Sequence, residues 1–435
     1  MWVYKQELSP AFFYMGLRDK PLSLMFLFCV AILSILPIAW MPGAITRPSH
    51  LILWLLYLLV VIPSCVMPYF VVDIGTVRTL QWASVIIFTF WLIFWCSRLT
   101  TIKTPGIGLS NKAFWAVVFG FSFLSYYVVL SVFGLQLNVV SLAEVYSVRE
   151  AYKEDLAEGG RWVSYMVLWQ TNVVNPLFIS QGLIRRVPLL LVLGVCGQIF
   201  LYSITGFKSI LFSTPLLVIA LVALQFYRRR AGSFFVWGAV FLIGICVFFD
   251  KISGSILFSS IFVRRLMIVP GQLSAYYYEF FSDNPFYMLQ HSILRPFVDR
   301  SYDVAPAMLI GDAYFGNFEM SANANLWADA FANFGFAGMF AYAVIFGFVL
   351  QFLDKVAEGQ DLRASCLLVT MPAISLCNTS LLTTLLTHGL GFAILMVYLM
   401  PVPQTNPVQE VSPSRKKHKF GFLKAKTFFA SVTKD

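Results

Sequence analysis

The sequence predicts an all-α polytopic integral membrane protein. Of its 435 residues, 59% are hydrophobic and only 12% are charged, and the mean hydropathy is +0.77. A soluble domain carries about 25% charged residues, because it needs them to cover its surface. Apolar runs of about 18–22 residues recur along the chain, and each is long enough to cross a bilayer as a helix. These observations exclude a water-soluble, disordered or fibrous protein.

The apolar runs predict about eleven spans, within a range of about ten to twelve. At this length only helices satisfy their own backbone groups in lipid, and the alternating polarity of β-barrel strands is absent from the sequence. We therefore expect the whole chain, 1–435, to form a single transmembrane domain. The runs lie near 22–41, 51–72, 79–97, 113–134, 162–183, 188–206, 209–227, 233–250, 334–353, 363–383 and 388–402.

Clusters of arginine and lysine mark alternate connections between the runs, and such clusters are retained on the cytoplasmic side of a membrane. They include Arg98, Arg185–Arg186, Arg228–Arg230 and a basic tail at 404–435. Placing all of them in the cytoplasm gives a consistent alternation of spans from residue 98 to the end. The connections at 135–161 and 251–333 are then two long loops on the outer side.

The first residues fit this orientation less well. Lys5, Arg18 and Lys20 favour the cytoplasm, whereas an odd number of spans with the tail inside puts residue 1 outside. Either the first apolar run, which Pro37 interrupts, is re-entrant, or the chain contains a further span. The sequence leaves this choice open.

The short cytoplasmic connections exclude the usual nucleotide chemistry. They contain neither a Walker A motif nor a GxGxxG motif after a strand. Most of the polar residues lie on the outer side, where nucleotide donors are absent. A group transfer there needs an activated donor that is already carried on a lipid.

We expect neither a metal nor any other cofactor. The seven cysteines all lie in apolar stretches without a CxxC pair, which is typical of buried thiols rather than of a disulfide framework or a zinc site. A DxD motif, which could bridge a metal to a diphosphate, does not occur in the sequence. Cationic side chains would then have to stabilise any phosphate leaving group.

The outer connections contain cations that the positive-inside tendency does not favour on that side. Arginine suits phosphate, because its planar guanidinium donates two parallel hydrogen bonds and keeps its charge. The alternative is that each arginine only snorkels to the surface or pairs with a nearby acid. The candidate pyrophosphate-binding residues are Arg149, Arg161, Lys208, Arg264, Arg265, Arg295 and Arg300.

Two of the four histidines fall on the predicted outer side. His291 lies in the 251–333 loop, and His388 lies in "LLTTLLTHGLG" at the predicted turn between the last two runs. Since the ordinary pKa of histidine is about 6.5, either side chain could accept a proton or bind phosphate. The alternative for His388 is a helix-end residue that its neighbours cap.

Aromatic residues follow the arginine pair in "RRLMIVPGQLSAYYYEFFSDNP". Tyr276, Tyr277 and Tyr278 suit either an amphipathic helix at the membrane surface or a platform that stacks on sugar rings. The interfacial helix is the simpler interpretation.

These residues resemble those of the bacterial oligosaccharide repeat-unit polymerases, the family that includes the O-antigen polymerases. The resemblance rests on the arginines, Pro270–Gly271 and aromatic residues of 264–281, on "SANANLWADAFANFGFAGMFAY" at 321–342, and on the proline-containing "LLYLLVVIPSCVMPY" at 55–69. Similar residues surround Lys208 in "GFKS" and His388 in "THG". In hydropathy the likeness covers most of the chain, whereas its local motifs cover about a fifth.

The resemblance implies a lipid-phospho-sugar glycosyltransferase of GT-C-like architecture in the bacterial inner membrane. It would join repeat units carried on undecaprenyl pyrophosphate at the periplasmic face, during lipopolysaccharide or similar polysaccharide biosynthesis. The transfer would be inverting and independent of metal. Expected partners are the lipid-linked oligosaccharides, membrane lipids, a chain-length regulator and a flippase, but not nucleic acid.

The resemblance also implies roles for individual side chains. His388 or His291 would be the general base, with Asp329 or Glu279 as the carboxylate alternatives. The residues expected to contact sugars are Tyr276, Tyr277, Tyr278, Asn323 and Asn325.

Two other activities would suit a similar chain. An O-antigen ligase would share the fold and the use of arginine but would transfer to another acceptor. A flippase or transporter of lipid-linked sugars should line a central cavity with charge, whereas the apolar runs here contain almost no ionisable residues. A scaffold without catalytic activity is the remaining alternative.

Overall fold

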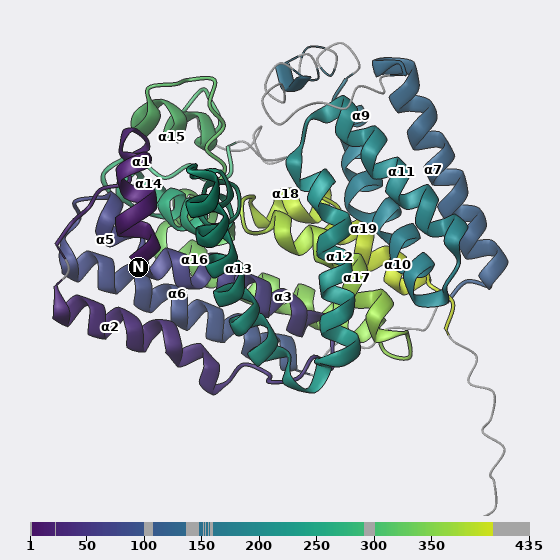
Figure 1. Cartoon of the computed structure of the whole chain (residues 1–435), viewed down its shortest axis with the longest axis horizontal. Coiled ribbons are helices and arrows are strands. Elements are labelled where there is room, and N and C mark those ends of the chain that lie inside the picture. Colours follow the sequence, from purple (N-terminus) through teal and green to yellow (C-terminus); the bar gives the residue numbers. More distant parts are fainter. Residues whose placement is uncertain are drawn as a thin grey trace, which may run out of the picture. The chain divides into compact units, whose positions relative to one another are not determined.

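The computed structural model describes residues 2–21, 23–99, 108–135, 148–150, 152, 154, 156, 160–290 and 301–402. Within these ranges the regular elements are all helices (Figure 1). Eight of them are long and apolar enough to cross a membrane. The predicted class, an all-α protein embedded in a membrane, is therefore confirmed, while the number of about eleven spans stays a prediction.

The eight candidate spans account for most of the predicted apolar runs. They are α3–α5 (Pro48–Val71), α6 (Gly75–Arg98), α7 (Asn111–Phe133), α11 (Pro188–Thr205), α12 (Lys208–Phe226), η6 with α13 (Arg228–Ser253), α16 (Leu326–Val356) and α18 with α19 (Leu381–Leu399).

The other three predicted runs form shorter or interrupted helices. They are α2 (Leu24–Ile35) with the 3-10 turn η3 (Leu36–Ala39), α9 (Arg161–Trp169) with the π-helix η5 (Gln170–Val174) and α10 (Asn175–Arg185), and α17 (Leu362–Ser375).

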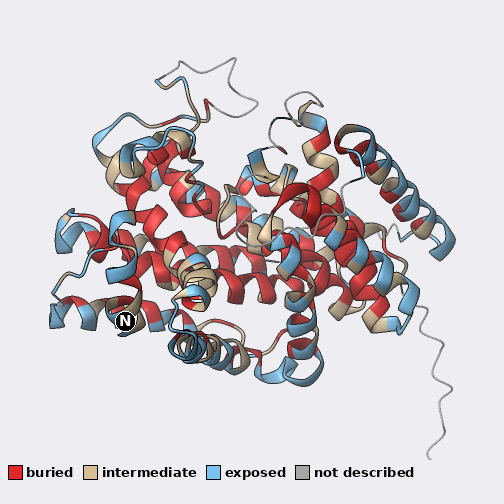
Figure 2. Ribbon diagram, turned by 45° about the horizontal axis from the view of Figure 1, so that its top comes forward, coloured by how far each residue is buried: buried red, intermediate tan, exposed pale blue. Residues whose placement is uncertain are grey.

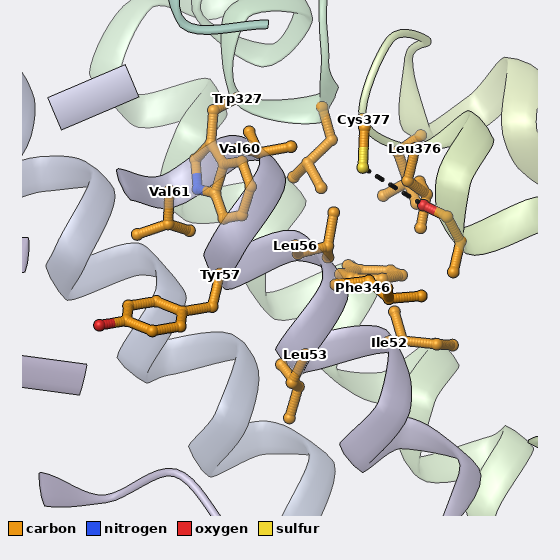
Figure 3. Packing of buried hydrophobic residues seen from close by; sticks show 14 of the residues in the cluster. Ile52, Leu53, Leu56, Tyr57, Val60, Val61, Trp327, Phe346, Leu376 and Cys377 are labelled. Carbon is orange, nitrogen blue, oxygen red and sulfur yellow. Dashed lines mark hydrogen bonds between the residues drawn. The ribbon is translucent and has the colours of Figure 1, made fainter. Parts of the chain in front are cut away.

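The core of the protein forms where α16 packs against α6. Gly347 of α16 lies against Cys96 and leaves no room for a side chain, and the indole N–H of Trp327 donates to the hydroxyl of Thr89 at 2.9 Å. The first half of the 48–71 span, α3 (Pro48–Leu56) and the π-helix η4 (Tyr57–Val61), packs beside this pair. Figure 3 shows its side chains between Trp327 and Phe346 of α16. Buried residues lie inside the helix assembly, and the outward helix faces are exposed (Figure 2).

A glycine breaks α16 near its start. Gly335 has φ of 60°, in the left-handed region that favours glycine, and Phe334 before it is also non-helical. Gly338 lies so close to the Ala330 carbonyl that a Cβ would overlap it. The break therefore separates a short first segment, which contains Asp329, from the long packed part of α16.

One end of the helix assembly, the basic end, collects the predicted cytoplasmic connections. The Arg228 guanidinium donates to the Ile45 carbonyl at 3.0 Å, and Ser49 donates its hydroxyl to Asp354 at 2.6 Å. The Gln360 side chain donates to the Met400 carbonyl at 2.6 Å. The loop before α3 therefore lies beside the Arg228–Arg230 turn and the end of α16.

The other end, which we call the α14 end, holds the N-terminal segment. Lys20 donates to the Val72 carbonyl at 2.7 Å and pairs with Asp73, so the start of α2 lies beside the turn between α5 and α6. The Asp73 backbone N–H in turn donates to Glu279 at 3.4 Å. The first apolar run thus connects the α14 end with the basic end, while the choice between a re-entrant run and a further span stays open.

The segment 251–333, expected to be a long loop, is largely helical where it is described. Its elements are the π-helix η7 (Ser259–Ile268), α14 (Val269–Asp283) and α15 (Pro306–Phe315). The N-terminal turns are η1 (Tyr4–Leu8), α1 (Ser9–Ala11) and η2 (Phe13–Met15). The last of these turns contacts α14, because Gln272 donates its side-chain amide to the Met15 carbonyl at 2.6 Å. The tail at 404–435 lies outside the described residues.

We predict that Gly347→Ala destabilises the protein, because the new methyl group would overlap Cys96 and lie 3.0 Å from the Ile93 carbonyl oxygen. Overpacking of this kind costs about 1–3 kcal/mol, which thermal unfolding of the purified protein would show as a lower midpoint. Gly120→Ala is the matched control, since a Cβ there meets no atom within 4 Å. Equal midpoints for the two variants would contradict the α6–α16 packing.

A second prediction concerns the α14 end and the basic end of the helix assembly, which we expect on opposite faces of the membrane. Cysteines introduced at Tyr14 and Asn284, both exposed at the α14 end, should react with a membrane-impermeant maleimide from the same face of the membrane. A cysteine at Arg229 should react only from the opposite face. Labelling of all three positions from one face would contradict this arrangement.

Candidate functional site

The arginine pair lies on η7, whose start is capped by a buried carboxylate. Asp250, at the end of α13 (Ala231–Ser253), accepts hydrogen bonds from the backbone N–H groups of Phe258 and Ser259, both at 2.8 Å. This is the interaction that satisfies free N–H groups at a helix start. A π-helix is rare and occurs frequently at functional sites. Asp250 therefore anchors the element that presents Arg264 and Arg265.

The two arginines have different surroundings. The Arg264 guanidinium lies 4.2 Å from the centre of the Phe12 ring and donates to the hydroxyl of Ser260 at 3.3 Å. Arg265 is exposed and makes neither an ion pair nor a hydrogen bond with the described residues. The N-terminal segment therefore covers one guanidinium and leaves the other open to a ligand.

Arg149 and Lys208 meet at the turn between α11 and α12. Gly206 ends α11 with φ of 61°, and Arg149 donates its Nε–H to the Gly206 carbonyl at 3.2 Å. The same guanidinium lies 5.6 Å from the centre of the Phe207 ring. Lys208 begins α12, half-buried, and forms no ion pair within the described ranges. The turn therefore gathers two cations that lie about sixty residues apart in the chain.

An aromatic contact links these two pairs. Phe212, one turn after Lys208, packs edge-on against Phe262 of η7, with the ring centres 5.3 Å apart. One residue separates Phe262 from the arginine pair. We call Arg149, Lys208, Arg264 and Arg265 the cation group. In the described part of the chain no carboxylate forms a salt bridge with Lys208 or Arg265.

Some predicted residues fall outside what the structure describes. His291, Arg295 and Arg300 lie in the undescribed range 291–300, and of Arg161 only the backbone, at the first position of α9, is described. Their predicted roles stay predictions.

Glu279 is held by a tyrosine that the sequence did not single out. The Tyr314 hydroxyl donates to Glu279 at 2.8 Å, and the Tyr314 ring stacks on Tyr276 with the centres 4.1 Å apart. Burial, and after it the neighbouring carboxylate, raises the pKa of Tyr314, so this hydroxyl stays protonated and remains a donor. Because Tyr314 is 35 residues further along the chain, no local pattern predicts this pair.

Asp73 brings two further cations to the α14 end. Arg18 and Lys20 both pair with it, and Arg78 lies 3.7 Å from Asp283 at the end of α14. The hydrogen bond from Lys20, together with the Arg18 guanidinium, lowers the pKa of Asp73 and keeps it ionised. The signal in the sequence that could have indicated this pairing is Asp73 itself, an acid in the short connection at 72–75 after the second run.

The predicted sugar-contacting tyrosines are buried. Tyr276, Tyr277 and Tyr278 have exposed fractions of 2%, 3% and 3%, and the Tyr277 hydroxyl donates to the Ala322 carbonyl at 3.2 Å. In this structure the three rings pack the interior around α14. Their contact with a sugar stays a prediction.

The two predicted asparagines differ in their exposure to solvent. Asn325 caps α16, because its side chain accepts from the Trp327 N–H at 3.1 Å, and it also donates to the Ser274 hydroxyl at 2.7 Å. Asn323 is exposed, two residues before the cap. Of the pair, only Asn323 presents its side chain to solvent.

Asp329 lies in the first turns of α16, half-buried. Asn333 donates its side-chain amide to the Asp329 backbone carbonyl at 2.8 Å, which ties the short segment together before the break at Gly335.

His388 lies deeper than a turn at the membrane surface. Helix α19 (Leu390–Leu399) has 10 residues and so rises only about 15 Å from the basic end, half the thickness of the hydrocarbon layer. The His388 carbonyl accepts from Asn172 at 3.2 Å, and the His388 Nδ1 is buried without a hydrogen-bond partner among the described residues. The hydropathy of the sequence predicted a turn at His388. Hydropathy does not show, however, that α18 and α19 are separate short helices.

A buried polar network surrounds η5, next to His388. Gln170 donates its side-chain amide to Asn175 at 2.8 Å and to Ser122 at 2.9 Å, and the Tyr126 hydroxyl donates to Asn175 at 3.0 Å. Sequence reasoning passed over these residues, because single uncharged polar residues barely change the hydropathy of a run. They make this part of the membrane-embedded interior polar.

The comparisons with known proteins do not assign the chain to a family. No protein-family model, no curated protein and no solved structure matches it. Within the described ranges, no three histidine, cysteine, aspartate or glutamate side chains are grouped so that they could hold a metal ion.

We predict that Asp73→Asn loosens the N-terminal segment, because Arg18 and Lys20 lose their shared carboxylate. Since the folded pKa of Asp73 is lowered, its contribution is complete above the unfolded value of about 3.9 and disappears as the pH falls through the lower folded pKa. The thermal midpoint of Asp73→Asn should therefore lie below that of the unmodified protein at pH 7, by a small amount because the side chain is 67% exposed.

The difference should shrink in thermal unfolding below about pH 4, where the carboxylate of the unmodified protein becomes protonated. Asp312→Asn is the control, because Asp312 is exposed and forms no ion pair with the described residues. A difference that stays constant from pH 7 to pH 3 would show that the ion pairs are unimportant.

Proposed function

We propose that this protein is an oligosaccharide repeat-unit polymerase that works at the periplasmic face of the bacterial inner membrane. It would transfer an oligosaccharide from one undecaprenyl pyrophosphate to another lipid-linked unit. The observation that carries the proposal is the cation group. Three segments contribute to it, and Lys208 and Arg265 have no anionic partner in the described part of the chain. A diphosphate would supply the missing negative charge.

The proposed reaction forms one bond and breaks one. A hydroxyl oxygen at the non-reducing end of the acceptor attacks the anomeric carbon of the donor, and the bond from that carbon to the pyrophosphate oxygen breaks. The electron pair of this bond leaves with the pyrophosphate, whose negative charge grows in the transition state. Fixed cations stabilise that charge more than they stabilise the bound donor, so they lower the barrier. Attack from the opposite side inverts the anomeric centre.

The proton of the attacking hydroxyl passes to a general base. Three of the predicted candidates are described: His388, Asp329 and Glu279. The Nδ1 of His388 is buried without a hydrogen-bond partner among the described residues, whereas Glu279 already accepts a hydrogen bond from Tyr314. All three stay candidates for this base, and undecaprenyl pyrophosphate is the product released to the membrane.

The experiment that tests the function is chain elongation in detergent from purified lipid-linked repeat units. We expect Arg265→Ala to abolish the ladder of product lengths, since it removes the open cation, while the protein still inserts and purifies. Arg229→Ala, an exposed arginine at the basic end, is the matched control and should elongate normally.

A normal ladder from Arg265→Ala would contradict the assignment of the cation group. A flippase cannot produce a ladder without a membrane. If the protein is a flippase, the unmodified protein will therefore not elongate chains in detergent. A ligase would instead add glycan once to a different acceptor.

We further expect His388→Gln to reduce elongation by about 10²–10⁴-fold, the usual contribution of a positioned base. Binding of the lipid-linked donor should stay unchanged, because the cation group is intact. If Asp329→Asn or Glu279→Gln lost elongation to this extent and His388→Gln did not, the base would be that carboxylate.

A further inference from the structure

The N-terminal segment, residues 2–20, folds back on itself before α2 begins. The Tyr4 hydroxyl donates to the Arg18 carbonyl at 2.9 Å, so the helical turns at its start lie beside the stretch that follows them. The side chains of Tyr4 and Leu8, one turn apart, are buried, and so is that of Leu17. The segment is therefore a packed part of the protein with an inner face and an outer face.

The charged side chains of the helical turns at 2–11 are turned away from the outside. Lys5 pairs with Asp19 at 3.0 Å, and Glu7 lies 3.9 Å from the ammonium of Lys251. Lys5 and Glu7 are both half-buried. In a segment that faces water, charged side chains are normally the exposed ones.

The outer face of the same turns carries uncharged side chains. Trp2 is exposed, and Gln6 and Pro10 follow it at spacings of four residues, which keep side chains on one face of a helix. The next turn, η2, adds Phe13 and Tyr14, which are 67% and 77% exposed. Aromatic residues outside and charged residues inside are the reverse of what water selects. This pattern is typical of a helix whose outer face meets lipid.

Contacts with the ends of two candidate spans give the level of the segment in the membrane. Lys251 lies near the end of α13, and its ammonium is 5.5 Å from the centre of the Trp2 ring and 3.9 Å from Glu7. At the other end of the segment, Lys20 pairs with Asp73 in the turn between α5 and α6. A span ends where the hydrocarbon layer ends. The segment therefore lies at the level of the lipid headgroups.

We propose that the N-terminal segment is an interfacial anchor, whose aromatic outer face lies in the headgroup layer of the leaflet at the α14 end. Its partner is the lipid bilayer itself. Tryptophan and tyrosine gather at this level, because each ring has an apolar body and a polar tip. The chain continues into α2 with Leu24 and Met25, which are exposed and apolar, so the lipid-facing surface carries on into the hydrocarbon layer. This inference goes beyond the proposed function and does not rest on it.

The anchor also sets the level of the arginine pair. Phe12, next to the exposed Phe13, has its ring centre 4.2 Å from the Arg264 guanidinium, and the Met15 carbonyl accepts from Gln272 of α14. The segment thus contacts both η7 and α14. Since the outer face of the segment meets the headgroups, Arg264 lies at the same level, within reach of lipid phosphates.

Spin labels on the full chain, in vesicles of phosphatidylethanolamine and phosphatidylglycerol, test the anchor. The label is attached at Gln6→Cys or Phe13→Cys, both exposed positions, after the exposed Cys196 is replaced by serine. The signal of this background without the new cysteine is subtracted. Oxygen concentrates in lipid, whereas a nickel chelate stays in water. We expect the ratio of oxygen to nickel collisions to be higher at both labels than at Asp312→Cys, an exposed acidic position on α15.

The same labels decide between lipid, water and a second copy of the chain. Equal collision ratios at Gln6→Cys, Phe13→Cys and Asp312→Cys would show that the outer face meets water and would overturn the proposal. Spin–spin broadening between labels on two molecules would show that a second copy covers this face, which would also overturn it.

Photo-cross-linking supplies an independent measurement. A benzophenone amino acid in place of Phe13 keeps an aromatic ring on the outer face, and we expect it to form adducts with phospholipid that mass spectrometry detects. The same amino acid in place of Asp312 is the control and should form few. Equal yields of lipid adduct at the two positions would contradict the anchor. Neither measurement needs turnover, so the result stands whichever reaction the protein performs, and a protein that elongates chains without lipid contact at Phe13 would refute the anchor alone.

Discussion

The shared carboxylate of Asp73 determines how the first part of the chain is placed. Arg18 and Lys20 are cations at the end of the assembly opposite the predicted cytoplasmic connections, and both pair with Asp73. The N-terminal segment can then lie at the α14 end, where Met15 accepts from Gln272 and Phe12 covers Arg264. Asp73 thereby contributes to the placement of the segment that covers Arg264.

The two halves of the α14 end differ in how far their charges are paired. Around Asp73, Glu279 and Asp283, each acid has a cation or a hydroxyl as its partner, so little net charge remains. In the cation group, aromatic rings and oxygen acceptors hold Arg264 and Arg149, while Arg265 and Lys208 have no anionic partner among the described residues. A diphosphate would supply the counter-charge to these two cations, and this is the physical basis for proposing one there.

Irregular helices occur where these polar groups lie. The π-helix η7 presents the arginine pair, and η5 lies beside the Gln170 network and His388. In a membrane every backbone group must find a partner inside the protein, so a wider helical turn is tolerated only where neighbouring segments support it. Asp250 does so for η7, by accepting from the N–H groups of Phe258, which precedes η7, and of Ser259, its first residue. Helix α14, which continues η7, packs against α16, so the closely packed α6–α16 pair supports η7 through α14.

The composition and the apolar runs were sufficient to predict an all-α membrane protein, because hydropathy is a local property and the helical rise relates it directly to bilayer thickness. The same reasoning selected Lys208, Arg264 and Arg265 as candidate phosphate-binding cations, and of these Arg265 is exposed. It did not find that Arg18 and Lys20 share Asp73, that Tyr314 holds Glu279, that Tyr276–Tyr278 are buried, or that His388 lies well below the surface. Each of these depends on which helix ends meet and on where a short helix stops, and residues more than thirty positions apart leave no periodic signal in the sequence.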